Sequence, residues 1–410
     1  MKKIISLLAF VLAASSIYAG GFRISLQGQR ALAMGHTGVA VVNSAELAFF
    51  NPAGLVFLEN KLNISGGVTA VNSNTEFQNI DTGEVSKTDS SISTPFNFYA
   101  SYKINDYFTA ALAIYTPFGS TVEYPDDWVG SDLVEEISLK AIYFNPLISV
   151  KLTPTLSIGG GPIFATGSVF VERNVGNSIN PVNGERAGVE LEQDSGISDW
   201  GWVASAIFKP HEDVYIGATY RSIINLTADD GDVTYTNITL PDTKFSATLP
   251  LPAELTFGAS YQVNEKLLVT VEFNRQFWSS YESLDFDFTD PNTTDSINPR
   301  NYQDSNTYRI GGQYDLNEKI TLRAGYYLDQ SPVRSGLFSP ETPRNDSHGF
   351  TTGLSYNINS HLAIDASFLY LFFPEIDESF DATDNDTVDT FSGTFNSNAI
   401  IGGLGITYSL

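Results

Sequence analysis

Cysteine is absent from the 410 residues, which excludes disulfides, thiolate metal sites and cysteine nucleophiles. Positive charge is scarce: 22 Lys and Arg stand against 47 Asp and Glu, so we expect no nucleic-acid partner. Charged residues of both signs make up only 17% of the chain, below the roughly 25% usual for soluble proteins. The chain is instead rich in aromatics (13%) and holds 33 Gly, a composition that favours a large all-β protein.

The first residues have the pattern of a secretory signal peptide. A basic start at residues 1–3 is followed by an apolar run from Ile4 to Ala14 and by Ala19, after which we expect cleavage before Gly20. The run is too short for a membrane anchor, since a spanning helix needs about 20 residues, and no later stretch approaches that length. An exported chain of this kind enters a membrane only as a closed β-barrel, because open sheet edges cannot be satisfied in hydrocarbon.

From about Lys61 onward, apolar residues alternate with mixed ones in segments of roughly ten residues, as strands with one lipid-facing side require. Asn, Asp, Gly and Pro separate these segments. We predict 14 strands, an even number as single-chain outer-membrane barrels have, near 61–72, 93–103, 107–117, 137–151, 155–172, 198–209, 213–228, 243–262, 265–279, 305–316, 319–329, 347–357, 360–372 and 395–410.

Short and long links alternate along the predicted barrel. Hairpin-like links stand at Asn105, Asn264, Asn317 and Asn359, and long polar links occupy 73–92, 173–197, 280–304 and 373–394. Short turns at one end and long loops at the other are typical of outer-membrane barrels. A soluble β-sandwich also alternates, but it seldom distributes its links so regularly.

Residues 20–60 lack the two-residue period and contain many small residues. Ser44 is a candidate cap for a short helix that runs through Glu46 to Phe50 and ends at Asn51-Pro52. A 14-stranded barrel is too wide to be filled by its own side chains, since about eight strands already achieve that. The segment is therefore predicted to plug the lumen. The alternative, a periplasmic tail, leaves its apolar residues exposed.

Three arginines, Arg221, Arg309 and Arg323, fall on the mixed face of their strands and are predicted to point into the lumen. Two interpretations remain open. The arginines pair with lumenal Asp or Glu, or one of them binds an anionic ligand head group.

Motifs spread over the whole mature chain resemble those of one family. They are Asn51-Pro52-Ala53, Pro117-Phe118-Gly119-Ser120 with Trp128 and Gly130, Asn145-Pro146, Tyr220-Arg221-Ser222, and Arg323-Ala324-Gly325-Tyr326. In this order they resemble the FadL/TodX family of outer-membrane transporters for long-chain fatty acids and aromatic hydrocarbons. The resemblance implies a monomeric 14-stranded barrel, at 61–410, plugged by an N-terminal hatch at 20–60. The chain departs from the usual terminal Phe of such barrels, since it ends in Leu410.

The resemblance also implies a route for a hydrophobic ligand. It is captured among the extracellular loops, where we look to Phe118, Trp128 and Leu133. Movement of the hatch N-terminus then opens a path past a kinked third strand to a lateral exit through the barrel wall. That moving segment is Gly20, Gly21, Phe22, Arg23 and Ile24, and the candidate kink residues are Pro117 and Gly119. Proline removes a ladder donor and glycine allows a bulge, although Pro117 equally well ends the strand.

Asn51, with Pro52 and Ala53, is expected to form a tight turn that holds the hatch against the wall. We expect passive, binding-driven uptake without a cofactor or metal, by a protein surrounded by outer-membrane lipid and lipopolysaccharide. The ligand is a fatty acid or, alternatively, an aromatic hydrocarbon; a general porin or an adhesin are other uses of the scaffold.

An enzymatic function finds little support in the sequence. Hydrolase and phosphate-loop motifs are absent, and the four histidines are scattered, although a barrel lipase or protease stays possible because distant residues meet in a fold. Clusters of Asp at 229–232 and 381–389 lack the pattern of a calcium loop and fit a solvated surface facing cation-bridged lipopolysaccharide.

Overall fold

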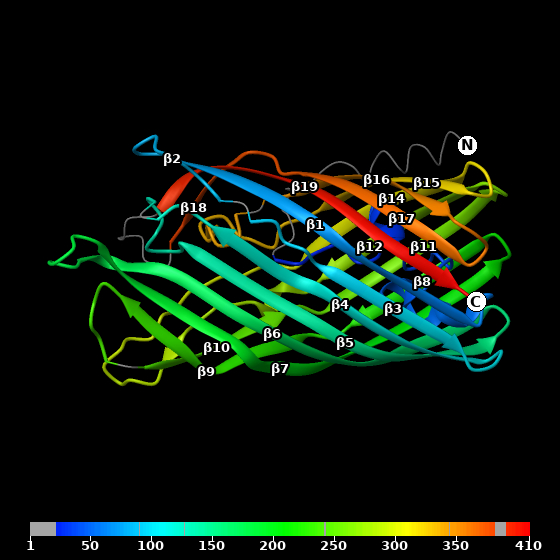
Figure 1. Cartoon of the computed structure of the whole chain (residues 1–410), viewed down its shortest axis with the longest axis horizontal. Coiled ribbons are helices and arrows are strands. Elements are labelled where there is room, and N and C mark those ends of the chain that lie inside the picture. Colours follow the sequence, from blue (N-terminus) through cyan, green and yellow to red (C-terminus); the bar gives the residue numbers. More distant parts are fainter. Residues whose placement is uncertain (1–21, 90, 127, 242, 344, 382–390) are drawn as a thin grey trace.

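The computed structural model describes residues 22–89, 91–126, 128–241, 243–343, 345–381 and 391–410. The predicted signal peptide, together with Gly20 and Gly21, lies outside the described residues. Within them, 14 antiparallel strands close into a barrel, as the sequence predicts, and β1 pairs with β19 to complete the ring (Figure 1). The strands of the wall are β1 (Leu62–Asn79), β3 (Phe96–Lys103), β4 (Phe108–Glu123), β5 (Glu136–Thr153), β6 (Leu156–Ile179), β7 (Arg186–His211), β8 with β9 (Val214–Arg221, Ile224–Thr236), β10 with β11 (Lys244–Leu251, Glu254–Asn264), β12 (Leu267–Gln276), β14 (Ser305–Asp315), β15 (Ile320–Asp329), β16 (Ser347–Asn357), β17 (Leu362–Phe372) and β19 (Phe391–Ser409).

Some predicted boundaries are wrong. The strands β6 and β7 contain 24 and 26 residues, so much of the predicted loop 173–197 is a ladder that continues beyond the apolar band. Two strands of the wall are instead interrupted, after Arg221 and after Leu251, at matching heights because β8 pairs with β11 and β9 with β10. The long loops carry the short elements β2 (Val85–Lys87), β13 (Asp287–Phe288), β18 (Ile376–Phe380) and the 3₁₀ helix η2 (Trp278–Ser280).

One turn design recurs at the end of the barrel with short links. At four of these links the side-chain oxygen of an Asn accepts hydrogen bonds from the backbone N–H groups two and three residues later, at distances of 2.8–3.1 Å, for Asn105, Asn264, Asn317 and Asn359. The Asn side chain thus replaces a backbone partner in a tight turn, as the sequence predicts for these positions. Short turns mark the periplasmic end of such barrels.

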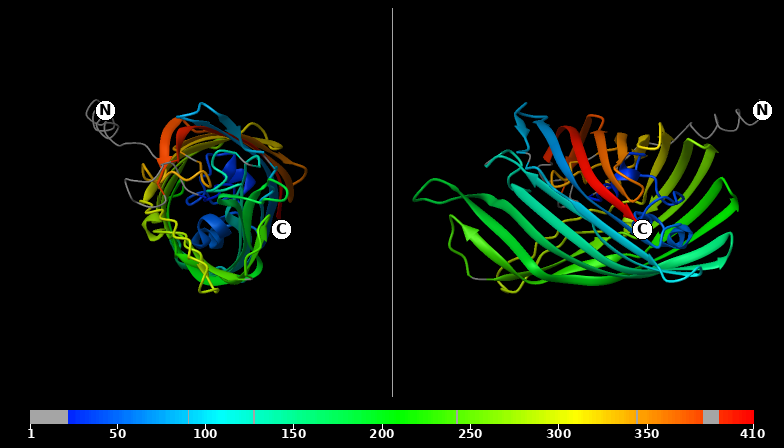
Figure 2. Two further views of the ribbon diagram at one scale, coloured as in Figure 1. Left: turned by 90° about the vertical axis from the view of Figure 1, so that its left-hand side faces the viewer. Right: turned by 45° about the vertical axis from the view of Figure 1, so that its right-hand side comes forward.

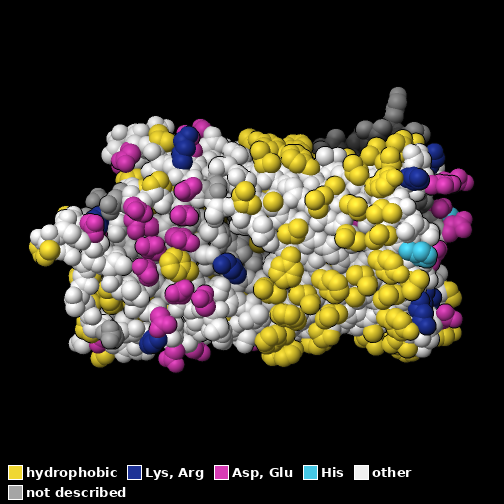
Figure 3. Space-filling view, viewed as in Figure 1, with side chains coloured by type: hydrophobic (Ala, Val, Ile, Leu, Met, Phe, Trp, Pro, Cys, Tyr) yellow, Lys and Arg dark blue, Asp and Glu magenta, His cyan; other side chains and the backbone are white. Residues whose placement is uncertain are grey.

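The outer surface is divided into an apolar and an acidic part. On the face shown in Figure 3, apolar side chains gather over the half nearer the short turns and most acidic ones lie toward the long loops, while a few more charged side chains lie at the short-turn end. The predicted apolar rows face outward: Ile216, Phe368 and Leu404 are 48%, 44% and 63% exposed. Beyond the apolar part, Glu123, Glu136, Glu172 and Glu190 lie directly opposite one another on adjacent strands. Among the described residues, no helix is long and apolar enough to span a membrane.

Residues 22–58 lie inside the barrel, where the end-on view shows them within the ring of strands (Figure 2). They contain α2 (Gln29–Leu32), α3 (Leu47–Phe50) and the 3₁₀ helix η1 (Pro52–Phe57). The predicted short helix is present and ends at Asn51, but Glu46 rather than Ser44 is its N-cap residue, without a side-chain cap bond. Below, residues 28–58 are called the hatch body and residues 22–26 the arm.

Candidate functional site

Asn51 joins the hatch body to the barrel wall. Its Nδ2 donates to the Val39 carbonyl (2.8 Å) within the hatch and to the Ala206 carbonyl (3.0 Å) on β7, while its Oδ1 accepts from Ala53 N (3.1 Å). The residue is fully buried, so each of these bonds satisfies a group that water does not reach. Pro52 follows as the first residue of η1, where its missing N–H costs nothing.

Ala53 is held by three serines of the wall. Its N–H donates to Ser205 Oγ (2.9 Å), and its carbonyl accepts from Ser149 Oγ (2.9 Å) and Ser157 Oγ (2.6 Å). The backbone comes this close because Gly159 has no side chain: a Cβ there would lie 2.5 Å from Ala53 N. Small polar residues and a glycine therefore form the seat of η1.

The loop after α2 is seated in the same manner on the opposite side of the barrel. A Cβ at Gly325 would lie 2.2 Å from Gly35 N, and a Cβ at Gly311 would lie 2.2 Å from the Met34 carbonyl oxygen. Gly35 N also donates to Thr351 Oγ1 (2.7 Å). These glycines allow the hatch backbone to lie directly on the strands.

Buried charges complete the contact between hatch body and wall. Glu46 accepts hydrogen bonds from Arg30 N (3.1 Å) and Ala31 N (3.0 Å), and burial, with a smaller contribution from Asp365, raises the pKa of Glu46. Arg30 Nε lies 3.0 Å from Asp365 Oδ1 of β17. Burial lowers the pKa of His36, whose Nε2 accepts from Gln27 N (3.2 Å), so His36 stays neutral.

Of the three predicted lumenal arginines, all are buried and two contact an acidic group. Arg221 lies 3.6 Å from Glu254 and donates to the Phe49 carbonyl (3.0 Å), and Arg309 lies 3.2 Å from Glu272. Arg323 donates instead to the side-chain oxygens of Gln313 (3.0 Å) and Ser355 (2.5 Å). The Arg221 guanidinium thus joins the wall to the hatch, whereas those of Arg309 and Arg323 bind side chains of neighbouring wall strands.

The arm is attached to β4 like an additional short strand. Ile24 N donates to the Pro117 carbonyl (2.9 Å), and Gly119 N donates to the Phe22 carbonyl (3.3 Å). At this point the register between β4 and β5 shifts between Tyr115 and Phe118, and β4 continues to Glu123 rather than ending at Pro117. An irregularity in the wall and the hatch N-terminus therefore lie side by side.

The side chains of the arm make two kinds of contact. The ring of Phe22 packs against Phe118 (5.9 Å between centroids), Trp278 (5.0 Å) and Tyr281 (5.7 Å). Arg23 crosses the lumen to Glu254 and Asp329 on the opposite wall.

Arg23 lies between two acidic residues without a close bond to either. Its Nη1 is 3.6 Å from Glu254 Oε1, and its Nη2 is 3.6 Å from Asp329 Oδ1 and 3.2 Å from Thr307 Oγ1. The Nε is buried and has no hydrogen-bond partner among the described residues. The guanidinium is consequently placed by electrostatics rather than by a full set of hydrogen bonds.

A cavity of about 640 Å³ extends from the arm to the barrel wall. Its walls include Arg23 and Ile24 of the arm, the segment 91–96, the residues 118–123 of β4, and apolar side chains of the last strands, among them Leu369, Leu371 and Ile401. The volume is in the range of small-molecule sites, ~300–1,000 Å³. A second cavity of about 40 Å³ adjoins it and is almost wholly apolar, with Leu226, Leu249 and Phe286 in its lining.

The wall is incomplete beside the large cavity. The ladder between β3 and β4 stops at Asn97 and Tyr115, and the next backbone hydrogen bond above it joins Asp89 N to the Glu123 carbonyl (2.8 Å). Among the described residues, no backbone hydrogen bond joins 116–122 to 91–96 between these two points. The cavity is lined by both of these edges.

The structure brings only one of the three predicted groove residues to these cavities. Phe118 lines both, and its ring packs on that of Phe22, which lines the smaller cavity. Trp128 instead stacks on Tyr124 (3.9 Å between centroids) and is 3% exposed. Leu133 is half-buried in the same loop, and neither it nor Trp128 lines the two cavities.

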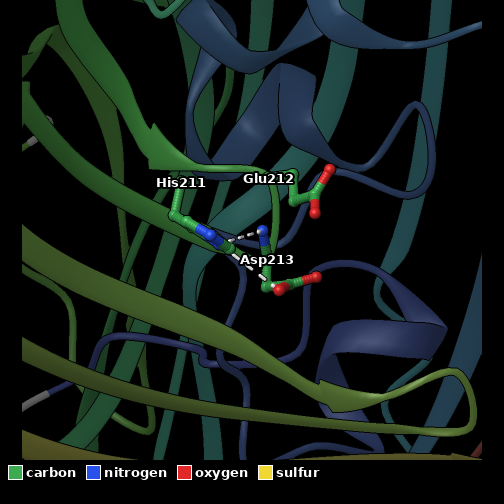
Figure 4. Close-up of side chains that lie close together, drawn as sticks. All are labelled: His211, Glu212 and Asp213. Carbon is green, nitrogen blue, oxygen red and sulfur yellow. Dashed lines mark hydrogen bonds and ion pairs between the residues drawn. The ribbon is translucent and has the colours of Figure 1, made fainter.

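The histidines and the acidic clusters have local roles. His211, Glu212 and Asp213 bring three possible metal ligands within 4.8 Å, yet they are largely exposed residues of one short turn, in which Asp213 N donates to His211 Nδ1 (3.3 Å) (Figure 4). His348 bonds to the Tyr326 hydroxyl (2.7 Å) and His361 to the Ser409 carbonyl (2.8 Å). Of the acidic cluster at 381–389, only Asp381 lies within the described residues.

Sequence reasoning missed the cavity itself, because its lining comes from strands at both ends of the chain. It also assigned Arg23 to the moving segment without seeing its acidic neighbours. One signal was available: Arg23 is the first cation after the predicted cleavage site in a strongly acidic chain.

Together these features define an outer-membrane barrel whose lumen is filled by its own N-terminal segment. The family described as "Outer membrane protein transport protein (OMPP1/FadL/TodX)" matches residues 10–410, and the chain belongs to this family. The expected resemblance is thereby confirmed, and so is the location in the outer membrane of a Gram-negative bacterium. The protein is a transporter of the FadL/TodX type, in a family of transport proteins rather than enzymes.

Individual relatives agree with this assignment. The chain is 25% identical over 450 residues to outer membrane protein P1 of Haemophilus influenzae, with 98% of this chain and 97% of the relative covered. It is 22% identical over 401 residues to the long-chain fatty acid transport protein of Escherichia coli, with 88% and 89% covered.

Two solved structures share the fold. The Pseudomonas aeruginosa FadL homologue superposes with a TM-score of 0.82 at 20% identity, covering 95% of this chain and all of that one. The Pseudomonas putida toluene transporter TodX gives 0.75 at 18% identity, with 93% and 98% covered.

Proposed function

We propose that this transporter carries hydrophobic molecules, most readily long-chain fatty acids, inward by passive diffusion driven by binding. The observation that carries the proposal is the 640 Å³ cavity, which reaches from the hatch arm to an unpaired stretch of the wall. Relatives named for fatty acid and for toluene transport support the ligand class. Each buried CH₂ contributes about 0.8 kcal/mol, so a long acyl chain enters such a cavity without another energy source.

The proposed route has three stages. A ligand is captured at the extracellular loops, passes the small apolar cavity, and displaces the arm where Phe22 meets Phe118. It then occupies the large cavity and leaves sideways between 91–96 and 116–122, where backbone pairing is interrupted. In this proposal Pro117 and Gly119 form the exit, while Asn51, Pro52 and Ala53 keep the hatch body in place during transport.

The same proposal assigns a role to each segment of the chain and to its acidic outer surface. We take residues 1–19 as a removed signal peptide, 20–60 as the hatch and 61–410 as the barrel, acting as a monomer. In this proposal Glu123, Glu136, Glu172 and Glu190, beyond the apolar part of the surface, lie at the height of the lipopolysaccharide head groups. Divalent cations bridge these carboxylates to the head groups.

Uptake by cells that lack their own transporter tests the proposal. Labelled oleate and labelled toluene are offered with and without the protein, and with a variant lacking Gly20 to Ile24 whose barrel still folds. Saturable uptake that the deletion abolishes is the expected result, and the labelled compound that enters decides between a fatty acid and an aromatic hydrocarbon. Passage of small sugars with no uptake of either compound would mean an open porin, and function of the loops alone would mean an adhesin.

A further inference from the structure

We propose that Arg23 binds the carboxylate of an anionic amphiphile, and that this binding itself releases the arm. The inference rests on the proposed function and makes it specific: the preferred ligand is a fatty acid anion, and Arg23 is both its head-group site and the electrostatic attachment of the arm. Capture of the ligand and opening of the path are then one exchange of partners on a single guanidinium group.

The first argument is the unused hydrogen-bonding capacity of Arg23. Its side chain is 7% exposed, Nε has no partner among the described residues, and the contacts with Glu254 and Asp329 are both 3.6 Å, beyond hydrogen-bond range. A guanidinium has five N–H donors in a rigid fork, which fits a carboxylate in a two-bond arrangement at about 2.7–2.9 Å. An incoming carboxylate therefore offers Arg23 shorter bonds than either present neighbour.

The second argument is position. Arg23 lines the 640 Å³ cavity, as do the apolar residues Leu369, Leu371 and Ile401, so a chain packed along these strands places its head at the arm. Lys140 also lines the cavity, but it is an exposed residue of β5. Arg23 is thus the buried cation of this lining.

The arginines first considered for a head group are differently placed. Arg23, Arg221 and Arg309 all line a cavity of only about 20 Å³, too small for more than a water or two, but of the three only Arg23 also lines the large cavity. Arg221 in addition donates to the hatch body. Arg323 lines neither cavity and is bonded to Gln313 and Ser355. The structure therefore moves this proposed role from the three wall arginines to the hatch.

The coupling to opening follows from the place of Arg23 among the contacts that hold the arm. Ring contacts of Phe22, packing of Ile24 and Leu26 against the last strands, two backbone bonds to β4 and a bond from Gln27 Nε2 to the Ile24 carbonyl (2.8 Å) all hold the arm. Arg23 adds its attachment to Glu254 of β11 and to Asp329 and Thr307 of β15 and β14, which is the electrostatic part of this set. A carboxylate that takes over the guanidinium competes with Glu254 and Asp329 for it. A neutral hydrocarbon has no group that competes in this manner.

Binding of two ligands with the same chain tests the inference. Purified full-length protein in detergent is titrated with oleate and with oleyl alcohol, using wild type, Arg23→Gln, Arg23→Lys and Asp329→Asn. We expect Arg23→Gln to weaken oleate binding at least tenfold and to leave oleyl alcohol within twofold. Arg23→Lys should weaken oleate several-fold, and Asp329→Asn should tighten it several-fold because a competitor is removed.

Arg275→Gln is the matched control. It removes a cation that is paired with Asp304 at 3.1 Å, and neither of these residues lines the two cavities. Its affinity for both ligands should therefore equal that of wild type. Equal weakening of both ligands by Arg23→Gln would reduce Arg23 to a structural role, and unchanged oleate binding would overturn the inference. If Arg23→Gln does not fold, unchanged oleate binding in Arg23→Lys and Asp329→Asn overturns it equally.

These outcomes are separable from failure of the proposed function. Wild type that takes up neither oleate nor toluene contradicts transport of hydrophobic molecules altogether. Wild type that transports either compound, with oleate binding insensitive to Arg23, leaves the transport function standing and removes only the head-group site.

Discussion

The hatch body and the arm occupy the same lumen but are held in opposite ways. The body lies on glycines and is fixed to the wall by hydrogen bonds. Asn51 donates to the Ala206 carbonyl and Gly35 N to Thr351 Oγ1, while the Ala53 carbonyl accepts from Ser149 and Ser157. The arm has two backbone bonds to an irregular part of β4, apolar packing of Phe22, Ile24 and Leu26, and a cation 3.6 Å from its acidic neighbours.

The difference bears on which part of the plug a ligand displaces in the proposed route. Leaving a buried backbone group unsatisfied costs about 1–3 kcal/mol, so displacing the body carries many such costs at once. Displacing the arm breaks two backbone bonds and the ring contacts of Phe22, and in the proposed exchange a ligand carboxylate replaces the acidic neighbours of Arg23. This difference agrees with the proposal that the body stays in place and that a ligand displaces the arm.

The largest expected effect comes from removing the seat of the body. Gly325→Val introduces a Cβ that would lie 2.2 Å from Gly35 N, so the hatch loop must leave the wall, at a cost of about 3 kcal/mol or more. Cells should leak small polar dyes while the barrel still forms. Gly402→Ala is the control, since a Cβ there meets nothing within 4 Å. A sealed Gly325→Val barrel would show that the body is not fixed by close contact.

A somewhat smaller effect is expected for Asn51→Ala. The change leaves the Val39 and Ala206 carbonyls and the Ala53 N–H without this partner, which should cost about 2–3 kcal/mol of hatch stability. We expect dye leakage and an earlier thermal unfolding step with the strands intact by circular dichroism. Unchanged permeability in a folded variant would count against a sealing role for Asn51.

The contact between arm and wall is tested by Phe118→Asp. Phe118 packs on Phe22 and lines both cavities, so a buried carboxylate there should lower oleate uptake at least tenfold. Leu133→Asp changes a half-buried loop residue outside both cavities and should lower uptake by less than twofold. Equal losses in the two variants would place the capture site in the loop instead.

The smallest expected effect is on the pH dependence of folding stability and concerns Asp346. Its carboxyl group interacts with the charge of Asp329, the residue that Arg23 of the arm faces. Burial, and then the Asp329 charge, raises the pKa of Asp346 from 3.8 to about 8. The folded protein thus holds a proton that the unfolded chain releases, so stability falls as pH rises from about 4 to 8. Asp346→Asn keeps an acceptor for Ser331 N and should flatten this dependence. Thermal unfolding between pH 4 and 9 measures it; parallel wild-type and variant curves would contradict the assignment.

The barrel could be predicted from sequence because its signals are local. Alternation within a strand and an Asn at a tight turn act over a few residues, and Asn105, Asn264, Asn317 and Asn359 mark four turns correctly. The extensions of β6 and β7 were missed because strands outside the apolar band need no lipid-facing residues.

The cavity and the role proposed for Arg23 could not be predicted in the same way. Both depend on which strands face the arm across the lumen, and the partners of Arg23 come from β11, β14 and β15. Asn51 was identified as a hatch residue, but its bond to Ala206 connects positions 155 residues apart, which no local pattern reveals.

The closure of the ring between β1 and β19 has a consequence for how the chain assembles. The hatch is synthesised first, yet Gly35 and Arg30 bind Thr351 and Asp365, 316 and 335 residues further along the chain. Contacts of such sequence separation form late, because the intervening loop must be closed before they contribute any stability. The plug thus reaches its final place only when the last strands have joined the first, and a barrel that closes out of register has no complete seat for it. Leakiness of this protein is therefore also a readout of faulty assembly.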